Sequence, residues 1–398
     1  MKNILPNLSF LFLGILCFCQ PKKENIPASD SYAHSKLNFD AMAEAILERS
    51  QLQDGERVLL IAKPGEFDSL IYLLKDKIRS SNAEFLGAIS VTDDPPEGWS
   101  TDFSRACSGK SRDLLVQHMR NVDLGIMLPG VDTTHTPYVA MQMALRFGPS
   151  RTIHFHWAGA YHMDGSVLKR SQMVDELYQT ALLFTDYDKL SKHQKQFENA
   201  ARKGPIRVTT PLGTDIQFSI GDRPVTKQDG DASGSRSKHA RNLIDREIEL
   251  PAGAVRVAPM EKTVEGKIAF PDMLWGDVRV TGLVMDFVGG KAINIHATSG
   301  LEQVNKELQK SGTGASSFRE LAVGLNPLLA LPQVGIQWIP YYGYGAGIVR
   351  LSLGDNTELG GEVRGGYVRW NFFTDATVKI GDEIWIKDGR LIREVNKP

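Results

Sequence analysis

The sequence predicts a two-domain α/β protein, with a mostly parallel sheet in the N-terminal domain and a β-rich C-terminal domain. Its 398 residues are too many for one hydrophobic core and enough for two. Over residues 37–203 short apolar runs alternate with amphipathic stretches, as in sheets whose strands are joined by helices. Over residues 204–398 short strand patterns are separated by glycine turns, which is typical of β-rich domains.

The N-terminal domain is expected to begin with a helix over residues 37–51, where Met42 and Ile46 fall on one face. The apolar run 58–62 predicts a buried strand, which Pro64 ends. The same reasoning predicts further helices over 67–78, 114–120 and 189–203, and further strands over 85–91, 124–128 and 152–157. Because neither a Gly-x-Gly-x-x-Gly motif nor a P-loop follows any of these strands, no nucleotide cofactor is expected.

The C-terminal domain is expected to start at Gly204-Pro205, directly after the charged helix. A polar Gly/Ser loop is predicted over 229–237 and a helix over 301–309. Strand patterns cover residues 206–219, 255–259, 266–270, 278–287 and 293–296. The chain carries 46 Lys plus Arg against 47 Asp plus Glu, so no basic excess draws it to a phosphate backbone, and no nucleic-acid partner is expected.

The first 36 residues predict export and a lipid anchor. Residues 1–18 look like a signal peptide, since Lys2 precedes the apolar run 8–16, which is too short to span a bilayer. Cys17 and Cys19 follow at once, as in bacterial lipoproteins, so we expect acylation of Cys19 and a place in a bacterial cell envelope, on the periplasmic face or the cell surface. Residues 19–36 are polar and predict a flexible tether to the membrane. An ordinary signal peptide with two incidental cysteines is the alternative.

Several blocks of the second half resemble, in order, those of the M29 metallo-aminopeptidases (aminopeptidases T and S). These blocks cover residues 207–215, 250–259, 319–327, 349–356 and 369–371. The resemblance implies an α/β domain followed by a β-rich domain that carries the site, and it also implies a homodimer.

The resemblance further implies a site with two divalent ions, Zn or Co, that activate water. The six positions of the family's ligands are here Ala254, Glu320, Arg350, Thr357, Arg369 and Asn371. Only Glu320 keeps a ligand side chain, and a guanidinium group cannot coordinate a cation. We therefore expect a degenerate site without a metal cofactor and a non-catalytic or altered protein. The alternative is an active metal-dependent aminopeptidase that uses other ligands.

Two sets of residues offer other chemistry. Arg350 and Arg369, with Glu320 as a neutralising group, would form a pocket for a small anionic or peptide ligand; alternatively, Arg350 and Glu320 form only a structural ion pair. His154 and His156 fall on one face of a predicted strand and would be the ligands of the alternative enzyme, or else a solvated strand face.

Overall fold

The computed structural model of the protein describes residues 37–92, 95–333 and 335–393. The predicted signal peptide, the tether and Cys19 lie outside the described residues. Among the described residues, no helix has the length and apolar character needed to cross a membrane.

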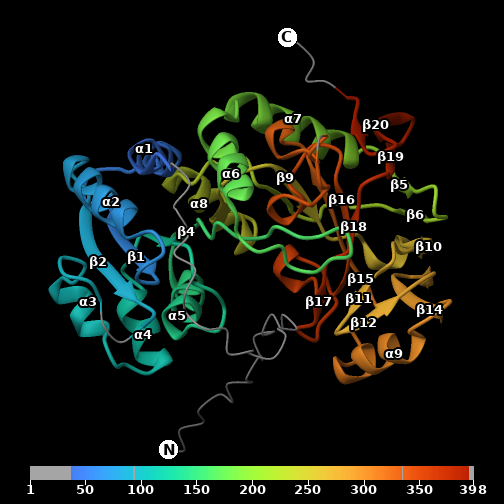
Figure 1. Cartoon of the computed structure of the whole chain (residues 1–398), viewed down its shortest axis with the longest axis horizontal. Coiled ribbons are helices and arrows are strands. Elements are labelled where there is room, and N and C mark those ends of the chain that lie inside the picture. The colour runs from blue at the N-terminus through green and yellow to red at the C-terminus, as the bar shows by residue number, and fades with distance from the viewer. Residues whose placement is uncertain (1–36, 93–94, 334, 394–398) are drawn as a thin grey trace, which may run out of the picture.

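A five-stranded parallel sheet, in the order β2-β1-β3-β4-β8, organises the first half of the chain (Figure 1). Its strands are β1 (Arg57–Ala62), β2 (Glu84–Ser90), β3 (Leu124–Met127), β4 (Arg151–His154) and β8 (Glu247–Glu249). The strands predicted over 58–62, 85–91 and 124–128 are thereby confirmed. The strand predicted over 152–157 ends early, at His154.

Helices cover both faces of this sheet, because alternate residues of each strand point to opposite faces. Val58 and Leu60 of β1 lie in one apolar cluster with the helices α1, α2 and α6, whereas Leu59 and Ile61 lie in another with α4 and α5. The helices are α1 (Phe39–Ser50), α2 (Asp68–Ser80), α3 (Asp102–Cys107), α4 (Arg112–Met119), α5 (Thr136–Ala144), α6 (Gln172–Phe184) and α7 (Tyr187–Ala201).

The last strand of the parallel sheet comes from beyond the predicted boundary at Gly204. After α7 the chain forms three strands of other sheets and the short helix α8 (Gly234–His239), and then returns as β8 to pair with β4. Residues 229–237, predicted as a loop, thus end inside a helix. The first sheet is therefore completed by the second half of the chain, and the division of the chain into two domains at residue 203 stays a prediction.

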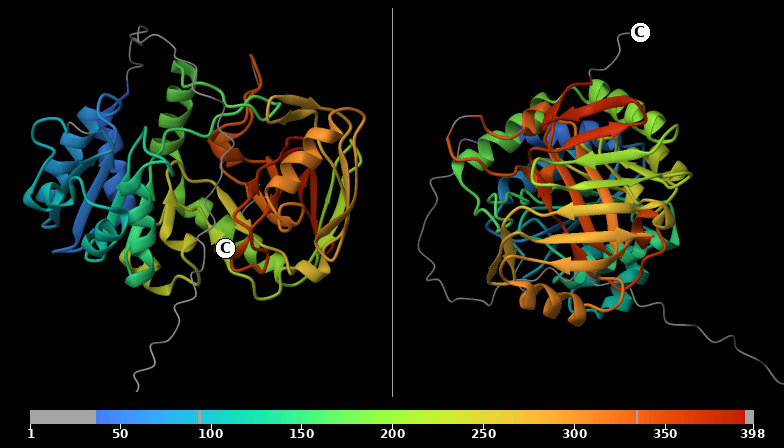
Figure 2. Two further views of the ribbon diagram at one scale, coloured as in Figure 1. Left: turned by 90° about the horizontal axis from the view of Figure 1, so that it is seen from below. Right: turned by 90° about the vertical axis from the view of Figure 1, so that its right-hand side faces the viewer.

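Two antiparallel sheets build the second half (Figure 2). The larger has eight strands in the order β14-β13-β10-β6-β5-β19-β20-β21, and the smaller has the order β17-β16-β15-β9-β7, with β18 also paired to β16. The larger sheet contains β5 (Ile206–Thr209), β6 (Asp215–Phe218), β10 (Glu265–Ala269), β13 (Val284–Val288), β14 (Lys291–His296), β19 (Thr377–Ile380), β20 (Glu383–Lys387) and β21 (Arg390–Leu391). The smaller contains β7 (Val225–Lys227), β9 (Ala254–Val257), β15 (Phe318–Gly324), β16 (Val349–Gly354), β17 (Val368–Arg369) and β18 (Phe372–Phe373).

The two antiparallel sheets share an aromatic core. Phe318 of β15 packs against Phe218 of β6 and Phe287 of β13, with ring centroids 5.2 and 6.3 Å apart. A hairpin of β11 (Met273–Trp275) and β12 (Val278–Val280) and the helix α9 (Leu301–Lys310) complete this half. The smaller sheet carries four of the six family ligand positions, and the other two, Thr357 and Asn371, lie shortly after β16 and β17. The face of this sheet to which each side chain points therefore decides which positions can meet.

Candidate functional site

The pairing register of the smaller sheet brings two arginines to the same face as Glu320. Ala322 of β15 lies opposite Arg256 on β9 and opposite Arg350 on β16. Directly paired residues point to one face, and Glu320 lies two residues before Ala322 on the same strand. The side chains of Arg256, Arg350 and Glu320 therefore share one face of the sheet.

Both oxygens of the fully buried Glu320 carboxylate are engaged by protein donors. Arg256 Nε donates to Oε2 at 3.0 Å, and Oε1 accepts Arg350 Nη2 at 3.0 Å and Ser352 Oγ at 3.2 Å. Burial alone would raise the pKa of this carboxyl, but the positive charges of Arg256 and Arg350 outweigh it and hold the pKa well below its usual range. Glu320 is therefore ionised, and both of its oxygens already accept hydrogen bonds from the protein.

Arg319 and Glu358 extend this network. A bulge between Phe318 and Glu320 turns Arg319 so that its Nε lies 3.8 Å from Glu320. Its Nη2 donates to Glu358 in the 3₁₀ turn Thr357–Leu359, and Glu358 also accepts from Arg256 Nη2 at 3.2 Å. We call these five residues, Glu320, Glu358, Arg256, Arg319 and Arg350, the Glu320 cluster.

Arg350 has the arrangement of a structural ion pair rather than of an open anion site. Its side chain is 2% exposed. Besides Glu320, it donates from Nη1 to the Tyr342 carbonyl at 3.0 Å, and its guanidinium lies 4.6 Å from the centre of the Trp370 ring. Two hydrogen bonds to protein acceptors and one ring face thus surround the charge.

Arg369 does not join Arg350, so the predicted convergence of these two arginines is wrong. Arg369 pairs with Leu353, the neighbour of Ser352 on β16, and therefore points to the opposite face of the sheet. There it donates to Glu307 Oε1 at 3.1 Å and to the Leu274 carbonyl at 2.6 Å, above the ring of Trp275. A difference of one residue along a strand moves a side chain to the other face of the sheet, and this separates Arg369 from Arg350.

The remaining family positions serve local structure. Ala254 is buried in β9, and Asn371 donates to the Leu351 carbonyl at 2.9 Å. Thr357 is exposed and hydrogen-bonds Asp355. None of the three has a side chain that would bind Zn or Co strongly, and both oxygens of Glu320 accept hydrogen bonds from guanidinium groups. The six positions thus do not fit a pair of divalent ions.

His154 is buried against α5, so a solvated strand face is wrong for this residue, whereas His156 is partly buried and follows the end of β4. His156 Nε2 lies 3.2 Å from His154 Nδ1, while His154 Nε2 lies 2.8 Å from Gln142 Nε2 and 3.0 Å from Thr152 Oγ1. Burial lowers the pKa of His156 to about 4 and that of His154 well below its usual value, so both rings are neutral at pH 7. Within residues 37–92, 95–333 and 335–393, no three His, Cys, Asp or Glu side chains are arranged to hold a metal ion.

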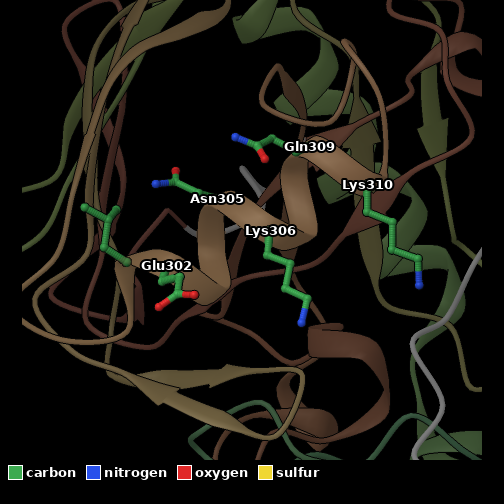
Figure 3. Close-up of a pocket in the computed structure, with 6 residues that line it drawn as sticks. Glu302, Asn305, Lys306, Gln309 and Lys310 are labelled. Atoms are coloured by element: carbon green, nitrogen blue, oxygen red, sulfur yellow. The ribbon is translucent and has the colours of Figure 1, made fainter.

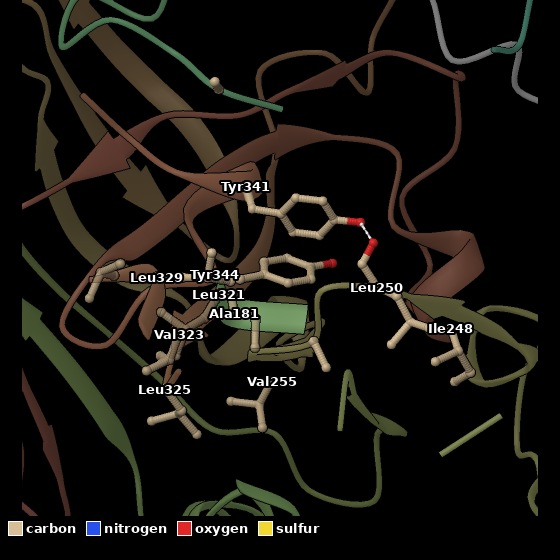
Figure 4. Packing of buried hydrophobic residues seen from close by; sticks show 14 of the residues in the cluster. Ala181, Ile248, Leu250, Val255, Leu321, Val323, Leu325, Leu329, Tyr341 and Tyr344 are labelled. Atoms are coloured by element: carbon tan, nitrogen blue, oxygen red, sulfur yellow. Dashed lines mark hydrogen bonds between the residues drawn. The ribbon is translucent and has the colours of Figure 1, made fainter. Parts of the chain in front are cut away.

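Two carboxylates that the sequence analysis missed lie beside these histidines. In β8, Glu247 pairs with Thr152 and Glu249 pairs with His154. Burial raises the pKa of Glu247 to about 8 and that of Glu249 to about 7. Tyr341 Oη donates to Glu249 Oε2 at 3.2 Å and to the Leu250 carbonyl at 2.7 Å, the bond drawn in Figure 4. We call Glu247 and Glu249 the β8 carboxylates.

A surface hollow on α9 is separate from all these groups. Figure 3 shows its lining, which comes from a single helix face. The lining residues are Leu301, Glu302, Asn305, Lys306, Gln309 and Lys310. None of them belongs to the Glu320 cluster or the β8 carboxylates, so this hollow plays no part in the candidate site.

The chain has an aminopeptidase-like fold. Wild-type AmpT from Thermus thermophilus, an M29 aminopeptidase T, matches with a TM-score of 0.56 at 15% sequence identity, over 89% of this chain and 99% of AmpT. The structure of 2,5-dihydroxypyridine dioxygenase from Pseudomonas putida KT2440 matches with a TM-score of 0.59 at 14% identity, over 89% of this chain and 96% of that one. No family model and no curated protein matches the sequence. At these identities the likeness establishes the fold alone.

Proposed function

We propose that this chain is a non-hydrolytic member of the M29 aminopeptidase scaffold, anchored in the cell envelope, that binds small peptides. The observation that carries the proposal is the Glu320 cluster. Where the family needs carboxylate and imidazole ligands around two ions, this chain has three guanidinium groups bound to Glu320 and Glu358. The guanidinium groups supply positive charge without a metal ion, but they cannot activate water for attack on a peptide bond.

Peptides are the ligand class that fits best. The anion pocket of Arg350 and Arg369 is not retained, because the two side chains lie on opposite faces of the sheet and bind protein acceptors. The scaffold of a peptidase and the partly exposed β8 carboxylates favour a peptide over a small anion.

Metal analysis and an activity assay test the proposal. Because both oxygens of Glu320 accept hydrogen bonds from arginines and the other five family positions lack strong ligands, dialysis without chelator should leave well under one Zn, Co or Fe per chain. Amino-acid anilides should not be cleaved, with or without added Zn or Co. Elemental analysis and release of the chromophore measure both. Stoichiometric metal together with turnover that Glu320→Gln abolishes would contradict the proposal.

The lipid anchor is a separate part of the proposal and has its own test. Cells that express the wild type should incorporate labelled palmitate into the protein, and Cys19→Ala should remove the label, since the acyl chains are attached to that thiol. Cys17→Ala is the matched control and should keep the label. Retention in Cys19→Ala with loss in Cys17→Ala would place the anchor two residues earlier, and label in neither protein would leave an ordinary signal peptide.

A further inference from the structure

One face of α6 is apolar, and the described part of the chain leaves it exposed. Met173, Leu177 and Phe184 are spaced so that they fall within about 40° of one another around the helix axis. Met173 is 45% exposed and Phe184 is 73% exposed, while Leu177 is half-buried. Apolar side chains that gather on one stripe, instead of lying singly, indicate a contact surface.

The polar residues on this side of α6 leave the stripe uncharged. Thr180 lies within the stripe and carries a methyl group beside its hydroxyl. Glu176 lies at its border, where Gln172 Nε2 donates to Glu176 Oε1 at 2.7 Å. This hydrogen bond turns the carboxylate along the helix toward its N-terminus and away from Phe184 at the other end.

A loop of the second half of the chain lies beside α6 and adds another apolar side chain. The loop follows the 3₁₀ turn Pro327–Leu329, which packs on α6 (Figure 1). It returns to α6 at Trp338, whose ring lies 6.3 Å from that of Tyr178. Between these two points Ile336 is 77% exposed. We call Met173, Leu177, Phe184 and Ile336 the α6 surface.

The described chain also begins at α6. Asn38, the N-cap residue of α1, donates its backbone N–H to Gln179 Oε1 at 2.6 Å. Residues 19–36 therefore connect Cys19 to a point on α6. Because a fully extended chain of that length spans at most about 60 Å, acyl chains on Cys19 would keep α6 within that distance of a bilayer.

A bilayer fits this surface better than a second protein does. A stable protein interface needs on the order of 20–30 residues on each side with matching shapes, and the α6 surface offers far fewer. A lipid interface needs no matching shape and accepts a narrow apolar stripe. Four apolar side chains would hold a free protein there only weakly, but a tether makes the contact intramolecular and raises its effective concentration to about the millimolar range.

We propose that the α6 surface lies in the interface of the lipid bilayer when the protein is anchored. The contact fixes which side of the molecule faces the membrane, whereas the acyl chains supply the affinity. This inference rests on the envelope anchor proposed above and adds the surface through which the folded chain meets the lipid.

A fluorescent probe that nitroxide-labelled lipids quench tests the proposal. The acylated full chain is placed in vesicles of phosphatidylcholine and phosphatidylglycerol, with nitrobenzoxadiazole attached to the new thiol of Phe184→Cys or Ile336→Cys. The native Cys107 is buried and does not compete for the label. We expect nitroxide lipids to lower the fluorescence of both variants about twofold or more, because a surface in the interface lies among the headgroups and upper acyl chains.

Leu114→Cys is the matched control. Leu114 is 46% exposed on α4, which packs on the face of the parallel sheet opposite to that of α6. A probe at this position should keep its fluorescence when nitroxide lipids are added. All three variants replace exposed side chains, and thermal melting checks that each is folded.

Flotation of the labelled protein with the vesicles separates this surface from the anchor on which it rests. Protein that floats but is not quenched in Phe184→Cys and Ile336→Cys, or is quenched equally in Leu114→Cys, would overturn the α6 surface and leave the anchor intact. A blue shift of Phe184→Cys that grows with protein concentration in the absence of vesicles would assign the surface to a second copy of the chain and overturn the proposal. Protein that does not float would overturn the anchor and, with it, this surface.

Discussion

Replacing Glu320 with glutamine is expected to lower the free energy of unfolding by about 3–5 kcal/mol, because it removes the central negative charge of a buried network. Arg256 and Arg350 would each lose a charged acceptor, and both side chains are less than one-tenth exposed. Glutamine has nearly the shape of glutamate, so the loss of stability measures the effect of the missing charge and not that of a cavity. Urea unfolding followed by circular dichroism at pH 7 measures the difference.

Glu362→Gln is the matched control for that measurement. Glu362 also faces an arginine, Arg223, at 3.4 Å, but its side chain is 77% exposed and solvent screens the pair. Its replacement should change the free energy of unfolding by less than about 1 kcal/mol. If Glu320→Gln were as stable as Glu362→Gln, the cluster would not be a buried charge network, and the argument against a metal at this place would lose its basis.

Replacing Glu249 with glutamine is expected to stabilise the protein at alkaline pH and to have no such effect at pH 5. Burial raises the pKa of Glu249 to about 7, above the value near 4.3 of an unfolded chain. Because the pKa is raised in the folded protein, the contribution of Glu249 to stability is fully present below about pH 4.3 and is lost as the pH rises through 7. The wild type therefore loses stability between pH 5 and pH 8.5, whereas glutamine has no proton to lose.

Glu249→Gln is expected to raise the free energy of unfolding by about 1–3 kcal/mol at pH 8.5. This range is smaller than the pKa shift alone would give, because solvent screens the partly exposed side chain. Thermal unfolding at half-unit steps from pH 5 to 8.5 measures it. Glu302→Gln should run parallel to the wild type over the whole range, since that side chain is exposed. Parallel curves for wild type and Glu249→Gln would show that Glu249 is ionised normally in the folded protein.

Much of the fold could be predicted from local patterns. The run 58–62 became β1, the helix predicted over 37–51 became α1, and the helix predicted over 301–309 became α9. An unbroken apolar run, or helical spacing sustained over several turns, carries this information. The same periodicity is present over α6, where Val174, Tyr178 and Ala181 share a buried face, so this helix was predictable as well. The helix α3 has only six residues, too few to show a period.

The site could be predicted only in part, because strand register is not visible in one sequence. Arg350 and Arg369 occupy neighbouring blocks of the family pattern. Arg369 nevertheless pairs with Leu353 of β16, which puts its side chain on the face opposite to that of Arg350. Arg256 and Glu358 give no local signal of their role, since long-range pairing alone brings them to Glu320. The β8 carboxylates lie in a three-residue strand with one buried residue, Ile248, which no pattern would separate from a loop.

Because β8 completes the first sheet, the order in which the chain is synthesised affects its folding. A chain synthesised from its N-terminus presents β1 to β4 long before residues 247–249 have been made. During that interval the free edge of β4 exposes its backbone groups, and such edges promote pairing with other chains. Arg151 in β4 also lacks a hydrogen-bond acceptor during that interval, because its Nε donates in the folded protein to the Ala232 carbonyl, which is synthesised later. The first half of this protein must therefore remain incomplete until the second half emerges, so a fragment cut after residue 203 would be prone to aggregate.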